Sequence, residues 1–276
     1  MNNQIMVSIC CVTYNHEKYI RDAIEGFLMQ KTTFPIEILI HDDASTDGTA
    51  DIIREYEKKY PDLIKPIYQT ENQYSKGIKI FATYHYPRAK GKYIALCEGD
   101  DYWTDPYKLQ KQVDFLEENP EYVLCFHNVS ILNDSNGVIM SDYITREVPD
   151  TTNIYELAKG NYIHTPSVVF RNGLVKIFPK ELSKSPVGDY FLYMIVAQHG
   201  LIKKLRENMA IYRIHKGGVW SQNNNKTPQI ITMLKLLIRY FKGKDFNKIL
   251  IRRRNLLILN NLRLVKLLKK IKRFLK

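Results

Sequence analysis

The sequence predicts an α/β protein built on a mostly parallel sheet, and three observations support this fold class. Segments typical of strands and of helices alternate through roughly the first 120 residues. The strand segments are continuously apolar rather than alternating, as expected for strands covered by helices on both faces. At 276 residues, with 45% apolar and 25% charged residues, the chain is long enough for one large domain, or for a domain with an appendage.

The first part of the chain contains four expected strands and four expected helices. The strands are IMVSICCVTY (5–14), IEILIHDDAS (36–45), LIKPIYQ (63–69) and YIALCEG (93–99). The first helix is expected to be capped by Asn15 and the second by Thr46 or Asp47, with Pro61 ending the second. A weaker helix is expected around 78–84, and TDPYKLQKQVDFLEENP (104–120) has a cap and a proline in its first turn.

The second part of the chain has a mixed pattern. YVLCFHNVSIL (122–132) and VIMSDYI (138–144), joined through Asn136-Gly137, predict a hairpin. A short helix near 154–159, a strand at 165–171, an apolar helix at 187–200 and a long strand at 202–215 follow. Such an arrangement is typical of an α+β half that follows a parallel α/β half.

The cysteines and the first residues indicate a reducing compartment. Cys10, Cys11, Cys97 and Cys125 form no CxxC pair and no zinc spacing, so we expect them to be reduced and buried. The start MNNQIMVSICC has no basic segment followed by a long apolar one, and no apolar run reaches 18 residues. We therefore expect neither a signal peptide nor a membrane-spanning helix.

Two acidic clusters follow two of the expected strands. In HDDASTDGT (41–49), the residues from Ser45 onward are explained by a turn and a helix cap, whereas the adjacent Asp42 and Asp43 are not. A carboxylate at this position can accept a hydrogen bond from an imide N–H or a ribose hydroxyl. Because ligands of parallel sheets bind beyond the carboxyl ends of the strands, we expect Asp43, and with less reason Asp42, to lie in a binding site.

The second acidic cluster is EGDD (98–101). Glu98 and Asp100 are two residues apart and would share one face of an extended strand. Carboxylate oxygens on one face suit Mg²⁺ or Mn²⁺, which proteins often hold with one or two carboxylates and substrate phosphates. A polar loop, with Asp101 as a turn residue, is the alternative.

The sequence resembles the family 2 glycosyltransferases, whose fold is called GT-A, over roughly residues 5–220. The resemblance is carried, in order, by VSICCVTYNHEKYIRDAIEGFLMQ, IEILIHDDASTDGT, AKGKYIALCEGDDYWTDPYKLQKQVDFL, GDYFLYMIVAQHG and YRIHKGGVWS. It implies a catalytic domain at 1–225, with a nucleotide-binding half (1–120) and an acceptor half (121–225). A basic, amphipathic helical tail (226–276) would follow.

The resemblance also implies roles for individual residues. The nucleotide would lie against Thr13, Tyr14 and Asn15, with Asp43 and its neighbour Asp42 at the base or ribose. Glu98-Gly99-Asp100 matches the family's DxD motif, with Asp100 as the main ligand of Mn²⁺ or Mg²⁺. Glu98 replaces the usual Asp, so it would contact either the metal or the ribose. His215 matches a position that approaches the metal or the diphosphate, and Asp189 matches the catalytic base. Tyr102 and Trp103 would either form a wall for a sugar ring or pack in the core.

These roles imply an inverting transfer. The donor would be a nucleotide sugar, expected to be uridine-linked, and its diphosphate leaving group would be stabilised by the cation. Asp189 would remove the proton of the acceptor hydroxyl, although an Asp at a helix start more often acts as a cap. The acceptor would be a saccharide or a lipid-linked saccharide of the kind used in bacterial polysaccharide assembly.

Charge is concentrated at the end of the chain. Residues 226–276 contain 16 Lys and Arg and one acid, Asp245, within a chain of formal net charge +12. From Leu264 onward, apolar residues recur at helical spacing with basic residues between them: Leu264, Leu267, Leu268, Ile271, Phe274 and Leu275. Such a helix can lie on an anionic membrane or pack on the catalytic body. We expect segment 246–276 to bind the membrane, which predicts a cytoplasmic protein peripheral to the inner face of the cell membrane.

Two rival functions are weaker. A sugar nucleotidyltransferase shares the α/β fold and metal carboxylates, but it needs a glycine-rich phosphate loop that VTYNHEKY does not provide. The second rival is a protein that binds nucleic acid or a membrane through its basic tail. This function would not explain the acidic residues at the strand ends. We therefore expect no nucleic-acid partner.

Overall fold

The computed structural model describes residues 4–218 and 225–274, with side chains up to Leu262. The strands are β1 Val7–Thr13, β2 Ile36–Asp42, β3 Ile67–Tyr68, β4 Tyr93–Leu96, β5 Tyr102–Trp103, β6 Tyr122–Asn133, β7 Val138–Ser141, β8 Thr151–Thr152, β9 Val169–Arg171 and β10 Leu201–Ile214. The helices are α1 Ile20–Leu28, α2 Thr49–Lys59, α3 Lys108–Glu118, α4 Ile154–Ala158, α5 Lys180–Ser183, α6 Gly188–Ala197, α7 Thr227–Tyr240 and α8 Asn247–Phe274. A π-helical turn, Phe81–His85, and a 3₁₀ turn, Thr165–Ser167, complete the described elements.

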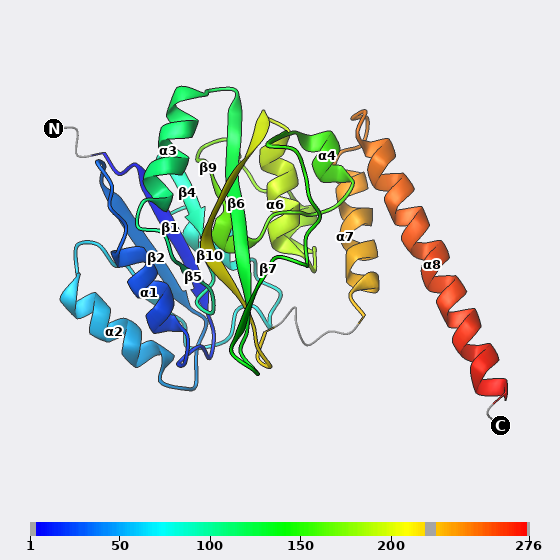
Figure 1. Cartoon of the computed structure of the whole chain (residues 1–276), viewed down its shortest axis with the longest axis horizontal. Helices are drawn as coiled ribbons and strands as arrows, with labels where there is room; N and C mark the ends of the chain where they lie inside the picture. Colours follow the sequence, from blue (N-terminus) through cyan, green and yellow to red (C-terminus); the bar gives the residue numbers. More distant parts are fainter. Residues whose placement is uncertain (1–3, 219–224, 275–276) are drawn as a thin grey trace.

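Within these residues, one sheet of ten strands has the order β3-β2-β1-β4-β9-β6-β10-β5, with β7 paired to β6 and β8 to β10 (Figure 1). Strands β1 to β4 pair in parallel, which confirms the parallel first half. Strand β9 is antiparallel to both β4 and β6, and β10 is parallel to β6. As a result β1, β2, β4, β6 and β10 all run in one direction, and their carboxyl ends meet at one edge of the sheet.

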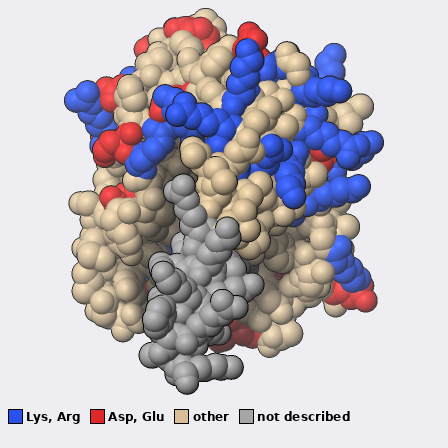
Figure 2. All heavy atoms as spheres, turned by 90° about the vertical axis from the view of Figure 1, so that its right-hand side faces the viewer, with Lys and Arg blue, Asp and Glu red and all other residues tan. Residues whose placement is uncertain are grey.

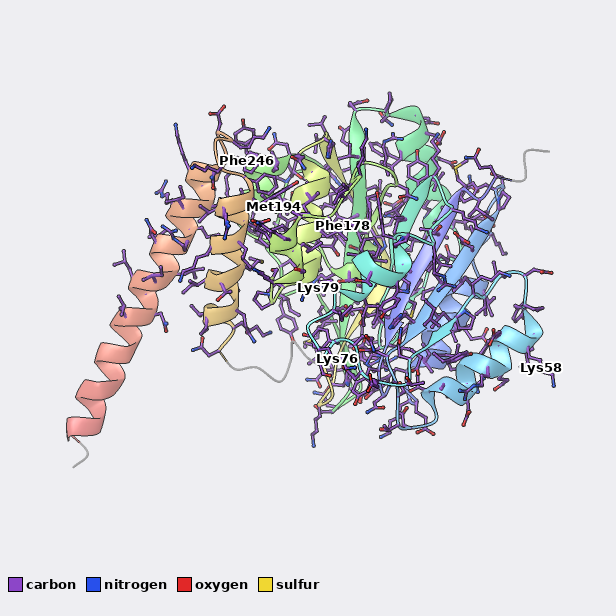
Figure 3. All side chains as sticks on the ribbon, turned by 180° about the vertical axis from the view of Figure 1, so that it is seen from behind. Lys58, Lys76, Lys79, Phe178, Met194 and Phe246 are labelled. Carbon is purple, nitrogen blue, oxygen red and sulfur yellow. The ribbon has the colours of Figure 1, made fainter. Side chains whose placement is uncertain are left out.

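Helices cover both faces of the sheet, and each face has its own apolar core. One core contains Phe27 of α1 and Leu109 of α3. The other contains Met194 of α6 and Phe246 of the α7–α8 connection, which lie on the same side of the sheet in Figure 3. The four cysteines are free and buried, as expected for a protein that keeps reduced thiols in its core.

The prediction that Asn15 caps the first helix is wrong. Helix α1 begins only at Ile20, with Tyr19 as the flanking residue and no side-chain cap. Asn15 has a left-handed backbone (φ 56°), and its side-chain oxygen accepts a hydrogen bond from the Thr46 amide at 2.8 Å. The second helix is flanked by Gly48 and has no side-chain cap, so the predicted cap at Thr46 or Asp47 is wrong by one or two residues. The Asp47 carboxylate nevertheless accepts the amide of Thr49, the first helical residue, at 3.0 Å.

The carboxyl-terminal segment has two parts. Helix α7 packs on the body through Met233, Leu234 and Leu237, and the start of α8 adds the buried Leu250. Beyond this contact α8 extends away from the body (Figure 1). The predicted apolar and basic stripe from Leu264 onward lies outside the side chains that the structure describes. Among the described helices, none is long and apolar enough to cross a bilayer.

Candidate active site

The loops that follow β1 and β2 are joined by a ladder of hydrogen bonds. The amide of Asn15 donates to Ser45 Oγ at 2.9 Å, and the amide of His16 donates to Thr49 Oγ1 at 2.8 Å. The Glu17 amide donates to the Asp47 carboxylate at 3.1 Å. Because each loop satisfies polar groups of the other, the carboxyl edge of the sheet has a fixed shape before any ligand binds.

Thr13 and Gly99 bring the ends of β1 and β4 into close contact. Thr13 is 1% exposed, and the Gly99 amide donates to the Val12 carbonyl at 2.9 Å. A Cβ atom on Gly99 would lie 2.6 Å from Thr13 Oγ1, so only glycine fits between the two chains. Tyr14, by contrast, is 43% exposed beside this contact. The acidic cluster after β4 is thus held directly against the end of β1.

The acidic cluster EGDD is a turn rather than a continuation of β4. The strand ends at Leu96, and the Asp101 amide donates to the Glu98 carbonyl at 3.1 Å. The expectation that Glu98 and Asp100 share a strand face is therefore wrong. Their carboxylates converge nevertheless, because the turn brings oxygens of Glu98, Asp100 and Asp101 within 4.8 Å of one another.

Two histidines approach the same oxygen of Asp100. His215, which directly follows β10, has its Nε2 atom 2.9 Å from Asp100 Oδ2. His16, from the loop after β1, has its Nε2 atom 3.8 Å from that oxygen. His215 reaches this edge because β10 runs parallel to β4 two strands beyond β9. The sequence predicted the place of His215 but did not single out His16.

The carboxylates differ in their electrostatic state. Reduced hydration in the crowded turn, with the charges of Asp100 and Asp189, raises the pKa of Glu98 to about 8. Burial and the charges of Asp100 and Glu98 raise the pKa of Asp101 well above its usual value. Burial opposes the ionisation of Asp100 as well, but the hydrogen bond with His215 and the charges of both histidines outweigh it and lower its pKa. Like charges this close favour a bound cation.

The donor atoms of this cluster fit a divalent cation. Asp100 Oδ1 and Asp101 Oδ2 are buried and have no hydrogen-bond partner among the described residues. Buried carboxylate oxygens without partners are rare in proteins, and a bound ion or water is one way to satisfy them. Oxygens of Glu98, Asp100 and Asp101 form one candidate ligand group, and the two histidines with Asp100 form the other.

The two aspartates at the end of β2 have different surroundings. Both Asp43 oxygens accept backbone amides, from Gln73 at 2.7 Å and from Tyr74 at 2.9 Å, and Asp43 is 1% exposed. In this structure Asp43 holds segment 73–74 with both oxygens, and its expected contact with a base or ribose stays a prediction. The Oδ2 atom of Asp42 accepts the Ser45 amide at 3.2 Å, and its Oδ1 is buried without a partner among the described residues. Burial raises the pKa of Asp42.

Asp189 lies in the first turn of α6 and shares the electrostatic environment of the acidic cluster. The residue flanking α6 is Val187, and no side-chain cap is present, so Asp189 is not the helix cap. Burial raises the pKa of Asp189, and its charge in turn raises that of Glu98. Tyr212 of β10 has its pKa raised by burial and then by the charges of Asp101, Glu98, Asp100 and Asp189. Asp100 and Asp189 therefore act on one common region.

Trp103 does not line a sugar site. It is 1% exposed, its ring packs edge-on against Phe27 at 4.9 Å, and its Nε1 donates to the Pro166 carbonyl at 2.8 Å. Tyr102 is half-buried, with the Arg213 guanidinium 5.3 Å above its ring. Of the two alternatives for Trp103, packing in the core is therefore correct. Strand β5 pairs with β10, and this pairing turns the Trp103 ring toward α1.

Arg213 is a second residue that the sequence did not single out. Its side chain is 7% exposed and donates to the Asp100 carbonyl at 2.9 Å and to the Asp22 carboxylate at 2.8 Å. Its amide donates to Asp101 Oδ1 at 2.8 Å. Arg213 therefore ties the acidic turn to α1 and β10. Its position two residues before His215, at the end of a predicted strand, was the only available signal.

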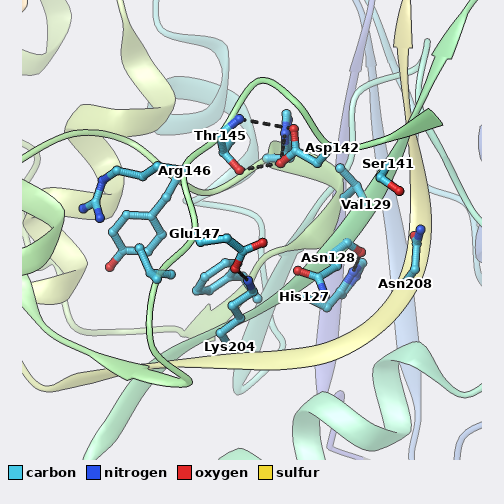
Figure 4. Close-up of a pocket in the computed structure, with 14 residues that line it drawn as sticks. His127, Asn128, Val129, Ser141, Asp142, Thr145, Arg146, Glu147, Lys204 and Asn208 are labelled. Atoms are coloured by element: carbon cyan, nitrogen blue, oxygen red, sulfur yellow. Dashed lines mark hydrogen bonds and ion pairs between the residues drawn. The ribbon is translucent and has the colours of Figure 1, made fainter.

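A polar cavity of about 300 Å³ lies beside this region, between β6, β10 and the segment after β7 (Figure 4). Lys204 Nζ lies 2.8 Å from a carboxylate oxygen of Glu147, and His164 Nε2 lies 3.1 Å from one of Asp142. The His164 ring also contacts that of Tyr212, tilted by 44° with ring centroids 4.8 Å apart. Tyr212 thus connects the cavity with the region of Asp189.

The chain is similar to one family model and to several known proteins. The family model described as glycosyl transferase family 2 matches residues 8–178. An uncharacterized protein of Mycobacterium tuberculosis is 41% identical over 217 residues, which are 78% of this chain and 60% of that protein. The glucosyltransferase WfaP of Escherichia coli, named for transfer from UDP-Glc to α-D-GlcNAc-diphosphoundecaprenol, is 31% identical over 84% of this chain and 85% of its own.

The fold has a solved counterpart. TarS of S. aureus, crystallised as residues 1–349 with UDP-GlcNAc, superimposes with a TM-score of 0.70 over 90% of this chain and 71% of its own, at 21% identity. The mycobacterial relative extends beyond the alignment, which spans 60% of its length. The match of the family model to well over half of the chain, and the similarity to WfaP along most of both sequences, show that the chain belongs to glycosyl transferase family 2.

Proposed function

We propose that the protein is an inverting glycosyltransferase that moves a sugar from a nucleoside-diphosphate donor to a hydroxyl of a saccharide or lipid-linked saccharide. The observation that carries the proposal is the cluster at the carboxyl edge of the sheet. Asp100 lies there with His215 2.9 Å away, and Asp189 acts electrostatically on the same turn. Cation ligands and a carboxylate base that act on the same turn are the two groups that this reaction needs.

In this proposal Asp100 and His215 hold a Mn²⁺ or Mg²⁺ ion, with Glu98 at the open side of the turn. Such an ion supplies positive charge for the diphosphate as the bond to the sugar breaks. Asp42, with its unpartnered buried oxygen, accepts a hydrogen bond from the base or ribose. Thr13, Tyr14 and Asn15, with Gly99, form the floor beneath the nucleotide.

Asp189 takes the proton from the acceptor hydroxyl. Burial raises the pKa of Asp189 above the usual 3.8, and a stronger base accepts a proton more readily. Attack from the side opposite the leaving group is a single displacement, so the configuration at the anomeric carbon inverts. The polar cavity beside Tyr212 offers hydrogen-bonding groups for the acceptor saccharide.

The choice of a uridine donor and of a lipid-linked acceptor follows the relatives. WfaP is named for a UDP-linked donor and an undecaprenyl-diphosphate acceptor, and TarS was crystallised with UDP-GlcNAc. A lipid-linked acceptor requires an enzyme that works at a membrane surface. We therefore propose that residues 1–225 form the catalytic unit and that α8 binds the inner face of the cell membrane.

The described part of α8 supports this membrane role. Leu256, Leu259 and Leu262 are each at least 51% exposed and recur at helical spacing. Figure 2 shows Lys and Arg side chains gathered over the end of the molecule that α7 and α8 form. The exposed basic residues there include Lys235, Arg239, Lys242, Lys244, Lys248 and Arg252. Exposed leucines with flanking basic residues are typical of helices that bind anionic membranes.

Calorimetric titration with a panel of nucleotide sugars, with and without Mn²⁺, tests the donor. We expect UDP-sugars to bind more tightly with Mn²⁺ than without it. We expect GDP-sugars to bind more weakly than UDP-sugars under both conditions. Product analysis by NMR then gives the anomeric configuration. Retention of configuration, or binding of no nucleotide sugar at all, would refute the proposed function.

The membrane proposal needs a truncation that spares the core. A cut near Thr227 would remove Met233, Leu234 and Leu237 from the apolar core, so the informative variant ends at Leu257. We expect the full chain, but not this variant, to sediment with vesicles that contain anionic lipid, and salt to release it. Equal sedimentation of both proteins, with circular dichroism showing that both are folded, would reject the proposal.

A further inference from the structure

The three-residue cluster of His16, Asp100 and His215 has ligand atoms within 4.8 Å of one another. The Nε2 atoms of the histidines lie 3.8 and 2.9 Å from the same Asp100 oxygen. The first of these distances is too long for a hydrogen bond. Two ligands about 2.1 Å from one ion lie about 3 Å apart when the angle between them is 90°, and farther apart at wider angles. The shorter distance fits a right angle at a shared cation, and the longer one fits a wider angle.

His16 is held in place by its own loop. Its amide donates to Thr49 Oγ1, and its carbonyl accepts the amides of Tyr19 and Ile20 at 2.8 Å, which starts α1. Its ring lies 5.8 Å from that of His215 and 6.2 Å from that of Tyr19. The side chains of His16 and Asp100 are each 14% exposed, and that of His215 is 4% exposed. The three groups therefore converge without help from a ligand.

We infer that His16 is a third protein ligand of the cation at Asp100, and that the protein binds a first-row transition-metal dication before any nucleotide arrives. The inference rests on the proposed function only in placing the cation at Asp100. Sites made of one or two carboxylates depend on substrate phosphates to complete the coordination of Mg²⁺. Two imidazoles and a carboxylate from three separate loops supply three ligands before any substrate binds.

The donor set also determines which cation is preferred. Imidazole nitrogen suits zinc and its transition-metal neighbours, whereas Mg²⁺ prefers oxygen and gives up its waters reluctantly. Manganese accepts both oxygen and nitrogen ligands. We therefore expect Mn²⁺ to bind in the presence of a large excess of Mg²⁺, and Zn²⁺ to displace Mn²⁺.

The test uses the metal-free full chain and Mn²⁺ alone. Loss of the electron paramagnetic resonance signal of free Mn²⁺ measures binding without nucleotide, and nitrogen modulation of the electron spin echo reports coordinated imidazoles. We expect one bound Mn²⁺ with two imidazoles, and His16→Asn to weaken binding about ten-fold or more with one imidazole remaining. His199→Asn makes the same change at an exposed histidine just after the carboxyl end of α6, whereas Asp189 lies at the amino end. This control variant is expected to bind Mn²⁺ like the wild type.

The possible results separate this inference from the proposed function. Mn²⁺ that binds only when UDP is added, or an echo from fewer than two imidazoles in the wild type, would overturn the inference even if glycosyl transfer is found. Mn²⁺ bound by two imidazoles would support it even if no donor binds. Because the echo is read on the wild type, the inference remains testable should His16→Asn fail to fold.

Discussion

Lys108 in the first turn of α3 allows a quantitative test of the structure behind the acidic turn. Its side chain is 0% exposed, and its amine donates to Gln112 Oε1 at 2.8 Å. Burial lowers the pKa of Lys108 from 10.5 to about 7. A shift of this size corresponds to about 4 to 5 kcal/mol of lost stability at neutral pH, because folding must release the proton or bury the charge. Lys108→Met removes this cost but leaves Gln112 Oε1 without a donor, at about 1 to 3 kcal/mol.

The sign of the pH dependence follows from the direction of the shift. Between the folded and the unfolded pKa, the unfolded chain binds more protons, so the stability of the wild type rises with pH. Lys108→Met should therefore change from about 2 kcal/mol more stable than the wild type near pH 7 to about 1 kcal/mol less stable near pH 9.5, a change of about 3 kcal/mol. Because the two proteins share all other titrating groups, the contributions of those groups cancel in the difference between the two free energies of unfolding.

Urea unfolding followed by circular dichroism at several pH values measures this difference. Lys111→Met, which removes a part-exposed amine from the same helix, serves as the control and should change stability by less than about 1 kcal/mol. The amine of Lys108 also lies 4.1 Å from the centre of the Trp103 ring, and this contact favours the charged form. A difference between Lys108→Met and wild type that does not vary with pH would show that the ring keeps the amine charged, and would refute the argument.

Three further predictions concern the candidate site. Asp189→Asn should lower kcat about 10²- to 10⁴-fold while leaving donor affinity, measured by calorimetry, unchanged; wild-type turnover would exclude Asp189 as the base. Since the base works only when ionised, kcat should rise with pH through the raised pKa of Asp189, and a steady-state profile without this acidic limb in the wild type would contradict the assignment. Trp103→Ala should cost about 3 to 5 kcal/mol in urea unfolding, as a core residue does; an unchanged stability with weaker acceptor binding would restore the sugar-wall role.

The parallel half of the fold could be predicted because local pattern and topology agree there. Continuous apolar strands and amphipathic helices alternate from β1 to α3, and short connections leave few ways to arrange them. The β6–β7 hairpin was equally accessible, through Asn136-Gly137 between two apolar runs. These elements depend on residues close together in the chain.

The details of the site depend on residues far apart in the chain. The cluster of His16, Asp100 and His215 forms only because β9 inserts antiparallel between β4 and β6, so that β10 ends at the same edge as β4. No local pattern specifies that insertion. The direction of Trp103 depends in the same way on β5 pairing with β10, and on Gly26, where a Cβ atom would lie 2.9 Å from the Trp103 amide nitrogen.

The carboxyl-terminal helices link the proposed membrane contact to the proposed base. Arg253 of α8 donates to the Tyr190 hydroxyl at 3.0 Å, and Tyr190 directly follows Asp189 in the first turn of α6. The Tyr190 hydroxyl in turn donates to the Leu157 carbonyl of α4, and Tyr190 is 1% exposed. Helix α7 packs on α5, which packs on α6. A surface bound by α8 would therefore hold α6 at a fixed orientation, with Asp189 at a set height above the headgroups. An acceptor whose lipid stays in the bilayer could reach the base only at that height, so we expect shortening of α8 to reduce transfer to a lipid-linked acceptor more than transfer to a soluble saccharide.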